Sequence, residues 1–272
     1  MHHHSKITDL YQGFLSTPFL WTKNPLNKLS QLQLPVHKAA HSYEGILPSN
    51  IRLGKIVERF VSHELNQYES INILRENLQI IENKITLGEI DCLLKLKEQF
   101  IHLEIVYKFY LYDPDNSSEE IDRWVGPNRK DSLIQKLTKL KEKQLPILFH
   151  KQTKSHLEKL QIKLAEIKQK TYFKAQLFVP LNLVNEKFLL VNNQCIKGFY
   201  IRLKELYLLN ENTFYIPSKI DWLLDLNSES NWISYTDFEP QVTQQLNNER
   251  SPLCWMKDKK GNTGKFFVVW WN

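Results

Sequence analysis

The stretch His102-Leu-Glu-Ile-Val-Tyr-Lys-Phe-Tyr-Leu111 is the clearest β-strand pattern in the chain. Successive side chains of a strand point to opposite faces, so this stretch divides into two sets. The odd-numbered positions are all apolar or aromatic and form a face suited to a protein core. Glu104 and Lys108 lie together on the opposite face. The stretch therefore predicts a strand that is buried on one side and carries an acid and an amine on the other.

A second acidic residue lies on the strand that we expect just before this one. The apolar residues of Gly88-Glu-Ile-Asp-Cys-Leu-Leu94 alternate, which places Asp91 on the polar side. Antiparallel pairing through a turn at residues 97–100 would put Asp91 and Glu104 at neighbouring positions of one sheet face. The sequence therefore predicts two adjacent carboxylates.

One helix and a further strand are expected before this pair. Apolar residues recur at helical spacing over residues 51–66, which predicts an amphipathic helix. Residues 71–85 and 87–96 are β-rich and are separated by Glu82-Asn83-Lys84, a break typical of a hairpin. These stretches predict a helix followed by a three-stranded antiparallel sheet.

The chain then returns through helices to a fourth strand. Leu133, Leu137 and Leu140 form one apolar stripe of a predicted helix. A second, basic helix is expected from about residue 151 to 171, and a strand from about 175 to 179. A meander followed by a helical crossover indicates a mixed sheet flanked by helices, so we expect an α/β (α+β) fold.

Glu58 is a third candidate for the acidic cluster. It lies on the predicted helix over residues 51–66, at the margin of the apolar stripe. Gly54, one turn earlier, is expected to let this helix approach the sheet closely and so bring Glu58 to Asp91 and Glu104. The alternative is an exposed Glu58 whose charge stays in solvent.

Adjacent carboxylates repel each other unless a shared proton, a basic partner or a metal ion compensates. Hard cations such as Mg²⁺ bind oxygen ligands, usually one or two carboxylates with water and phosphate oxygens. Lys108 is a possible basic partner, because it lies on the same strand face as Glu104. The residue types therefore favour a divalent metal site beside a phosphate group.

These residues carry a resemblance. An acidic residue on a first helix, Asp91 on a second strand and Glu104 with a nearby Lys on a third resemble the PD-(D/E)XK nuclease superfamily. The chain is similar, more closely, to the bacterial domain-of-unknown-function family 1853, which is assigned to that superfamily. The stretches that carry this similarity are Leu87-Gly-Glu-Ile-Asp91, Leu103-Glu-Ile-Val-Tyr-Lys-Phe-Tyr-Leu111, Trp124-Val-Gly-Pro-Asn-Arg-Lys-Asp-Ser-Leu133, Trp222-Leu-Leu224 and Phe266-Phe-Val-Val269.

The resemblance implies a nuclease-like core with a mixed sheet, followed by a β-rich C-terminal extension. It also implies that Asp91 and Glu104 hold Mg²⁺ or Mn²⁺, that Glu58 assists, and that Lys108 orients the attacking water. The sequence departs from the superfamily pattern at one position. The usual Lys lies two residues after the Glu, where this chain has Val106, and Lys108 lies two residues further along the same face.

Three functions are consistent with these features. The first is a Mg²⁺-dependent nuclease that hydrolyses phosphodiester bonds in DNA or RNA. The second is a nucleic-acid-binding module that has lost hydrolysis, which Val106 favours. The third is a structural or interaction protein in which the carboxylates form an internal salt bridge with Lys108.

Basic residues are concentrated in one segment. Residues 129–174 contain 13 Lys or Arg against 4 Asp or Glu, whereas the whole chain has a formal net charge of +6. Such a segment attracts polyanions, although a solvated helical face rich in Lys is an equally good explanation. The candidates for contacting nucleic acid are Lys130, Lys136, Lys139 and Lys143.

With 272 residues, the chain is long enough for a core with added parts. We expect an N-terminal extension over residues 1–45, the nuclease-like core over 46–180, and a C-terminal extension packed on the core over 181–272. The longest apolar runs are far shorter than the roughly 20 residues that span a bilayer, so no membrane partner is expected. Three Cys residues without a paired spacing indicate a reducing compartment, and we expect a cytoplasmic protein.

Overall fold

The computed structural model describes residues 2–22, 26–35, 42–48, 50–225 and 231–271. Its internal contacts divide the chain into two compact units, each built from segments that are far apart in the sequence. Unit 1 comprises Met1–Tyr11, Phe19–Tyr107 and Gln135–Lys174, and unit 2 comprises Gln12–Pro18, Lys108–Ile134 and Ala175–Asn272. The domain boundaries predicted near residues 45 and 180 stay predictions.

The strands of the described residues belong to a mixed sheet. The described residues form β1 (Ile71–Glu82), β2 (Ile85–Leu96), β3 (Gln99–Tyr112), β4 (Trp124–Val125), β5 (Ile167–Pro180), β6 (Ile196–Arg202), β7 (Thr213–Tyr215), β8 (Leu253–Lys257) and β9 (Thr263–Val269). Their order is β1-β2-β3-β5-β6-β9-β8-β7, with β4 paired to β3. β2 runs antiparallel to β1 and β3, whereas β6 runs parallel to β5 and β9. The predicted mixed α/β fold, a mixed sheet flanked by helices, is confirmed.

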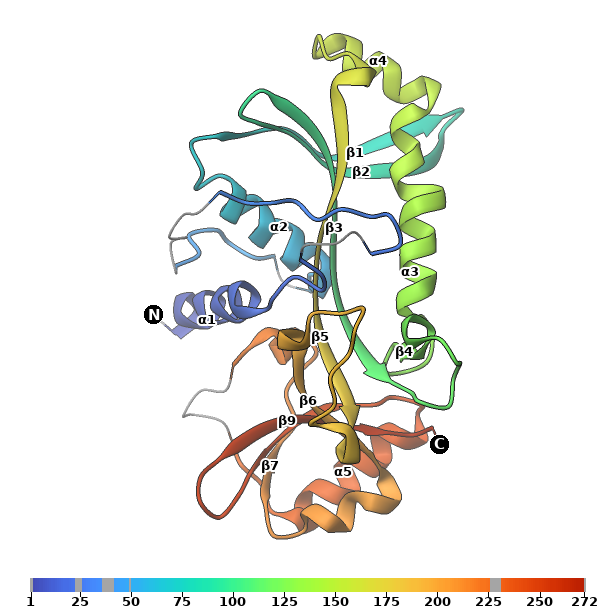
Figure 1. The fold of residues 1–272 in the computed structure, drawn as a ribbon. Helices are drawn as coiled ribbons and strands as arrows, with labels where there is room; N and C mark the ends of the chain where they lie inside the picture. The colour runs from blue at the N-terminus through green and yellow to red at the C-terminus, as the bar shows by residue number, and fades with distance from the viewer. Residues whose placement is uncertain (1, 23–25, 36–41, 49, 226–230, 272) are drawn as a thin grey trace. The chain divides into compact units, whose positions relative to one another are not determined.

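Helices accompany the sheet in both units (Figure 1). The described residues form α1 (His2–Ser16), α2 (Leu53–Leu65), α3 (Leu133–Lys139), α4 (Lys151–Lys159) and α5 (Tyr235–Asn247). The helix predicted over residues 51–66 is α2, and it buries Ile56, Phe60 and Leu65 as its periodicity requires. None of the described helices is both long and apolar enough to cross a membrane.

The first three strands are joined by tight turns with left-handed backbone. Asn83 and Lys84 have φ angles of 49° and 67°, which suits a two-residue hairpin turn and confirms the predicted break between β1 and β2. Lys97, with a φ of 52°, lies in the turn between β2 and β3. The β2–β3 ladder runs from Leu96 opposite Gln99 to Cys92 opposite Leu103. In this register Asp91 and Glu104 come next, just beyond the last pair.

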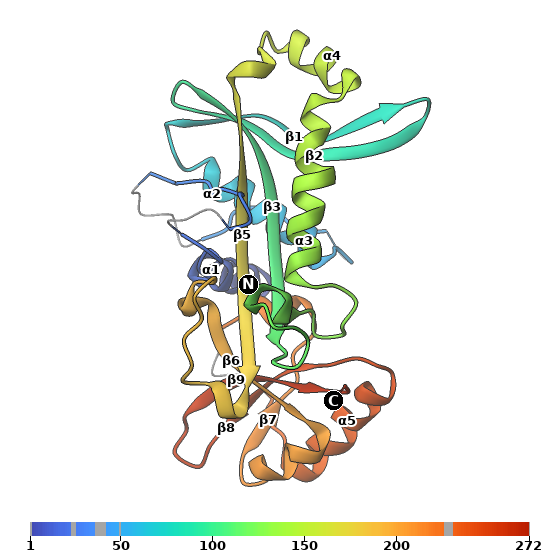
Figure 2. The same cartoon turned by 45° about the vertical axis from the view of Figure 1, so that its right-hand side comes forward.

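The segment between α3 and α4 changes its helical winding twice. α3 continues into a wide π-helical turn at Leu140–Gln144 and then into a tight 3-10 turn at Leu145–Phe149. Ile147 and Leu148 of the tight turn pack with Ile90 and Leu93 of β2 in a core cluster of unit 1. The same segment therefore lies against the β1–β2 hairpin, as Figure 2 shows.

The helix predicted over residues 151–171 is wrong beyond Lys159. α4 ends there, and the chain enters the long strand β5 at Ile167 rather than near residue 175. The reason is a C-terminal cap, because Gln161 has a φ of 57° and the Ile162 N–H donates to the Leu157 carbonyl oxygen at 3.0 Å. This 6→1 bond after a left-handed residue ends helices, although Gly usually occupies the left-handed position.

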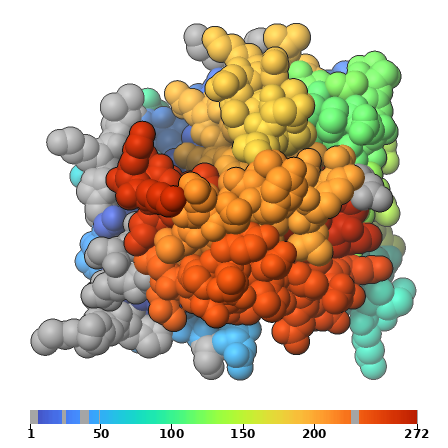
Figure 3. Space-filling view, turned by 90° about the horizontal axis from the view of Figure 1, so that it is seen from below, coloured from blue at the N-terminus to red at the C-terminus, as the bar shows by residue number. Residues whose placement is uncertain are grey.

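Unit 2 has its own core between α5 and the strands β6 to β9. Phe238 of α5 stacks on Phe214 of β7 with ring centroids 4.1 Å apart, and both side chains are buried with Phe266 of β9. Figure 3 shows α5 in red-orange on one face of this unit, beside the orange residues that precede it. The C-terminal part of the chain thus combines four strands with a helix.

Candidate functional site

Asp91 and Glu104 lie at neighbouring positions on β2 and β3, both in unit 1. They follow the last pair of the β2–β3 ladder, and the Asp91 carboxylate occupies the place where the ladder ends. Its Oδ2 accepts the Ile105 backbone N–H at 2.8 Å, so a side chain satisfies a donor that the ladder leaves open. This bond fixes Asp91 beside the residue that follows Glu104.

Burial makes both carboxylates hard to ionise. The Glu104 side chain is 0% exposed, and burial raises its pKa to about 8, opposed by Lys136 and assisted by the charges of Glu89 and Glu58. Burial, with the Glu104 charge, raises the pKa of Asp91 to about 6. A buried Glu104 and a half-buried Asp91 that repel each other are stabilised by a proton or by a cation.

Both oxygens of Glu104 have partners. His102 Nε2 lies 3.0 Å from Oε1, and Gln144 Nε2 donates to Oε2 at 2.6 Å. Gln169 Nε2 donates to the Leu145 carbonyl and lies 3.2 Å from His102 Nδ1, so Nδ1 acts as acceptor and Nε2 carries the proton. Burial lowers the pKa of His102 to about 4, so this imidazole is neutral at pH 7. The two donated hydrogen bonds favour ionised Glu104 and oppose part of the effect of burial.

Glu58 reaches the edge of this cluster from α2. Lys55 Nζ donates to Glu58 Oε2 at 2.6 Å, to Glu89 Oε1 at 2.9 Å and to Asn77 Oδ1 at 2.8 Å. Burial raises the pKa of Glu58, Lys55 lowers it, and the Asp91 charge raises it further. The side chain of Glu58 is 20% exposed, so it remains accessible to solvent.

The prediction that Gly54 lets α2 approach the sheet closely is wrong. A Cβ atom added at Gly54 would meet nothing within 4 Å, so the glycine allows no close contact with the sheet. α2 is instead held by the buried side chains of its apolar stripe, among them Val57 and Val61. Glu58 is positioned by the packing of its own helix.

The lysines predicted on and near β3 are in unit 2. Lys108 forms an ion pair with Asp131, and the Gly126 N–H donates to the Asp131 backbone oxygen at 2.7 Å. Lys130 is exposed and precedes the first residue of α3. Val106, at the position where the nuclease pattern has its Lys, is 4% exposed.

Lys136 is the basic residue that the structure connects to the acidic pair. Its Nζ donates to Gln144 Oε1 at 2.6 Å, and Gln144 in turn donates to Glu104. Its charge also acts on the pKa of both Asp91 and Glu104. Lys139 and Lys143, which were predicted with it as nucleic-acid contacts, are exposed.

Sequence reasoning did not single out the polar partners of Glu104. His102 was visible as a residue on the same strand face, two positions before Glu104. Gln144 was visible through its spacing, because Lys136, Leu140 and Gln144 follow one another at intervals of four. Gln169 gave no signal, because the sequence predicted it in a helix rather than at the start of β5.

The acidic cluster offers oxygen ligands for a hard cation. Among the described residues, no group of three or more His, Cys, Asp or Glu side chains is arranged to hold a metal. Mg²⁺, however, commonly uses one or two carboxylates and completes its shell with water and phosphate oxygens. Asp91 and Glu104 fit that donor set, and burial raises the pKa of both carboxyl groups more than the charge of Lys136 lowers it.

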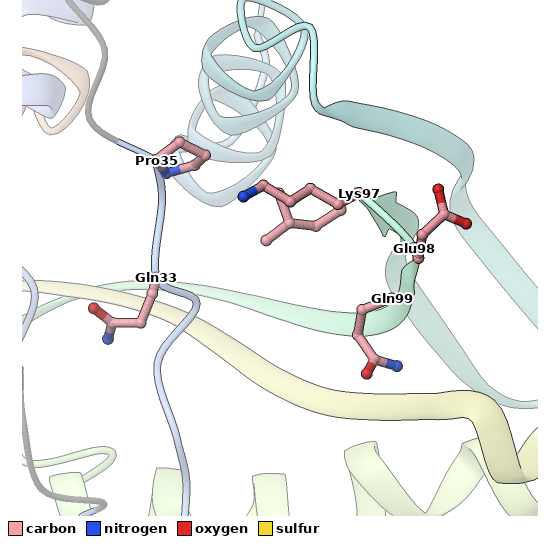
Figure 4. A pocket seen from close by; sticks show the side chains of 6 residues that line it. Gln33, Pro35, Lys97, Glu98 and Gln99 are labelled. Atoms are coloured by element: carbon pink, nitrogen blue, oxygen red, sulfur yellow. The ribbon is translucent and has the colours of Figure 1, made fainter.

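A surface pocket lies at the other end of the β2–β3 hairpin. It has a volume of about 520 Å³ and is lined by Gln33, Pro35, Leu96, Lys97, Glu98 and Gln99 (Figure 4). None of the residues predicted to act in the site belongs to it. The pocket therefore adds no group to the acidic cluster.

Comparisons with known proteins give a family but no activity. The model of the family described as "Domain of unknown function (DUF1853)" matches residues 12–269. No curated protein and no solved structure matched the chain.

Proposed function

We propose that this chain, which belongs to the DUF1853 family, is a Mg²⁺-dependent nuclease of the PD-(D/E)XK type that hydrolyses phosphodiester bonds in DNA or RNA. The observation that carries the proposal is the buried pair of Asp91 and Glu104 at the end of the β2–β3 ladder. The two carboxylates are adjacent, and the pKa of each is raised, as is common at functional sites. Both residues also belong to the pattern that resembles the superfamily.

Each residue has a role that follows from its place. Asp91 and Glu104 would hold the cation, with the Ile105 N–H fixing Asp91 and with His102 and Gln144 fixing Glu104. When bound, the metal would supply an acidified water and neutralise charge on the phosphate. Glu58, partly exposed and near Asp91, would hold a water at the rim of the site.

The basic segment supports a polyanionic substrate. Residues 129–174 carry the excess of positive charge, and several of their lysines, including Lys130, Lys139 and Lys143, are exposed. Cations of this kind bind the phosphates of either DNA or RNA without reading sequence. We therefore place nucleic acid first among the partners, and the cytoplasm as the compartment.

A second function is favoured by one specific observation. Val106 is buried at the position where the nuclease pattern has its catalytic amine, and the described residues form no group of three metal ligands. A nucleic-acid-binding module that keeps the fold and the basic segment without hydrolysis would show both features. A structural protein in which His102 and Gln144 merely satisfy a buried Glu104 is the third alternative.

A cleavage assay separates these alternatives. Labelled single-stranded and double-stranded DNA and RNA are incubated with the protein in Mg²⁺, Mn²⁺ or EDTA. The variants Asp91→Asn and Glu104→Gln are assayed beside Glu98→Gln, which removes one charge from a fully exposed side chain of the same hairpin. Cutting that requires metal and survives only in Glu98→Gln and the wild type supports the nuclease.

The other outcomes oppose the nuclease proposal. Salt-sensitive binding without cutting selects the binding module, because phosphate contacts weaken as salt rises. Neither binding nor cutting selects the structural protein. Cutting that is equally strong in Asp91→Asn and Glu104→Gln would show that the activity comes from other residues.

A further inference from the structure

We infer that Lys136 is a positioning residue of this site: it fixes the side-chain amide of Gln144 so that the amide donates to Glu104. The inference rests on the proposed function and deepens it, because it names a residue that orients one of the two candidate metal ligands. It replaces neither Asp91 nor Glu104 as a candidate metal ligand.

The chemistry of the contacts fixes the direction of this chain of hydrogen bonds. An ammonium group has donors and no acceptor, so Lys136 can meet only the oxygen of the Gln144 amide. The amide nitrogen must then face the other way, where it donates to Glu104 Oε2 at 2.6 Å. Without Lys136, a Gln side chain has two nearly equivalent orientations, and one of them turns its oxygen toward a carboxylate.

The backbone places the two residues for this contact. Lys136 lies on α3, and Gln144 is the last residue of the π-helical turn that follows it. Leu140, the first residue of the turn, and Leu145, which follows it, are buried and anchor it. π-helical turns inside helices frequently occur at functional sites, where they shift a side chain that regular winding would aim elsewhere.

The other lysines of the segment differ from Lys136. Lys139 and Lys143 are exposed, whereas Lys136 is half-buried and hydrogen-bonded to Gln144. Among the charged groups that act on Glu104, Lys136 has the largest effect, and it acts on Asp91 too. A lysine that served only to attract phosphate would not need this position.

The Glu104 carboxylate is hydrogen-bonded at both of its oxygens. His102 holds Oε1 and Gln144 holds Oε2, so rotation of the carboxylate breaks one bond or the other. Groups that orient a metal ligand in this way commonly contribute 10- to 100-fold to metal affinity or activity, which sets the size of the expected effect.

A double-mutant cycle tests the inference in the full-length protein. Lys136→Met, Gln144→Met and the double variant are compared with Lys259→Met, which removes an exposed lysine outside the basic segment. We expect each single variant to lower kcat for nucleic acid by about 10- to 100-fold with KM nearly unchanged, following the usual effect of such partners. The double variant should lose no more than either single variant, because both remove one connected chain. Lys136→Arg should retain activity, since Arg also donates to an amide oxygen.

A spectroscopic readout makes the inference independent of catalysis. The side-chain NH₂ signal of Gln144, identified by its loss in Gln144→Met, is followed by ¹H–¹⁵N NMR. We expect slow hydrogen exchange of this group in the wild type and in Lys259→Met, and faster exchange in Lys136→Met. The measurement requires neither metal nor nucleic acid.

The outcomes keep this inference apart from the proposed function. If the wild type cuts nothing but exchange accelerates only in Lys136→Met, the nuclease proposal fails and the positioning role stands. Unchanged exchange in Lys136→Met overturns the inference, whatever the activity. A loss in Lys136→Met that appears in KM alone, or losses that add in the double variant, would instead assign Lys136 to phosphate contact.

Discussion

At the scale of single residues, Glu104 has the most costly environment in the site. A carboxylate with no exposed surface loses its hydration, and the donors of His102 and Gln144 replace only part of it. Burial therefore raises its pKa to about 8, so the folded, metal-free protein keeps a proton on Glu104 that the unfolded chain has released at neutral pH. Under the proposed function, a bound cation would replace that proton.

This raised pKa predicts how stability depends on pH. The folded state binds more protons at Glu104 than the unfolded state between about pH 4.5 and 8, so stability falls as pH rises through this range. Asp91 acts in the same direction but only up to about pH 6, and His102, whose pKa is lowered, acts in the opposite direction below about pH 6.5. From pH 6.5 to 7.5 the free energy of unfolding should fall by about 1 kcal/mol through Glu104.

Urea unfolding of the metal-free protein at pH 6.5 and 7.5 measures this fall. In Glu104→Gln, which cannot titrate, the fall should disappear, whatever the absolute stability of that variant. A fall of the same size in both proteins would show that Glu104 is already ionised at pH 6.5 when the protein is folded.

The sequence allowed the main acidic residues to be predicted, because strand alternation is a strict two-residue period. Asp91 and Glu104 follow from that period and from the hairpin register. Gln144 could not be predicted with the same certainty, because its direction depends on a π-helical turn that no local pattern marks. The ion pair of Lys108 with Asp131 is likewise a contact between residues 23 positions apart.

At the scale of elements, the boundary between α4 and β5 shows where local patterns mislead. The segment after Lys151 is rich in charged and helix-forming residues, so its composition favours a longer helix. The helix instead ends because Gln161 adopts a left-handed conformation and because Leu157 and Ile162 are both buried in the core of unit 1. Tertiary packing outweighs helix propensity here, and the chain enters β5 at Ile167.

This cap predicts a stabilising substitution. Gln161 has a φ of 57°, a region that costs a residue with a Cβ about 1 kcal/mol and that glycine adopts freely. Gln161→Gly should therefore raise the free energy of unfolding by about 0.5–1 kcal/mol. The neighbouring substitution Leu160→Gly should lower it, because Leu160 has ordinary helical angles. Thermal unfolding of the two variants checks the prediction, and a loss of stability in Gln161→Gly would contradict the cap.

At the scale of the whole molecule, the acidic cluster and the excess of basic charge come from different parts of the sequence. The acids of the site lie on α2, β2 and β3, whereas the positive excess is carried by residues 129–174. In the proposed function both are used, because the basic residues would attract the polyanion and the acids would hold the cation. Mutation should therefore be able to weaken nucleic-acid binding without changing the cutting rate.

That separation can be tested on Lys139 and Lys143. The double variant Lys139→Gln/Lys143→Gln should bind nucleic acid more weakly, and the slope of log K against log salt should shrink by about 2, since each phosphate contact contributes about 0.9. The cutting rate at saturating nucleic acid should stay unchanged. Lys259→Gln, an exposed lysine outside the basic segment, serves as the control. Equal affinities for the double variant and the wild type would exclude this segment from the interface.

The proposed nuclease depends on the binding of a divalent cation by Asp91 and Glu104 together. Isothermal titration calorimetry with Mn²⁺ at pH 7, in buffers of different ionisation enthalpy, measures affinity and proton release together. We predict one Mn²⁺ bound by the wild type and by Glu98→Gln with release of about one proton, chiefly from Glu104, because a metal-ligating carboxylate must be ionised. Asp91→Asn and Glu104→Gln should lose this binding. Undiminished Mn²⁺ binding in both of these variants, or none in the wild type, would show that Asp91 and Glu104 do not form the cation site.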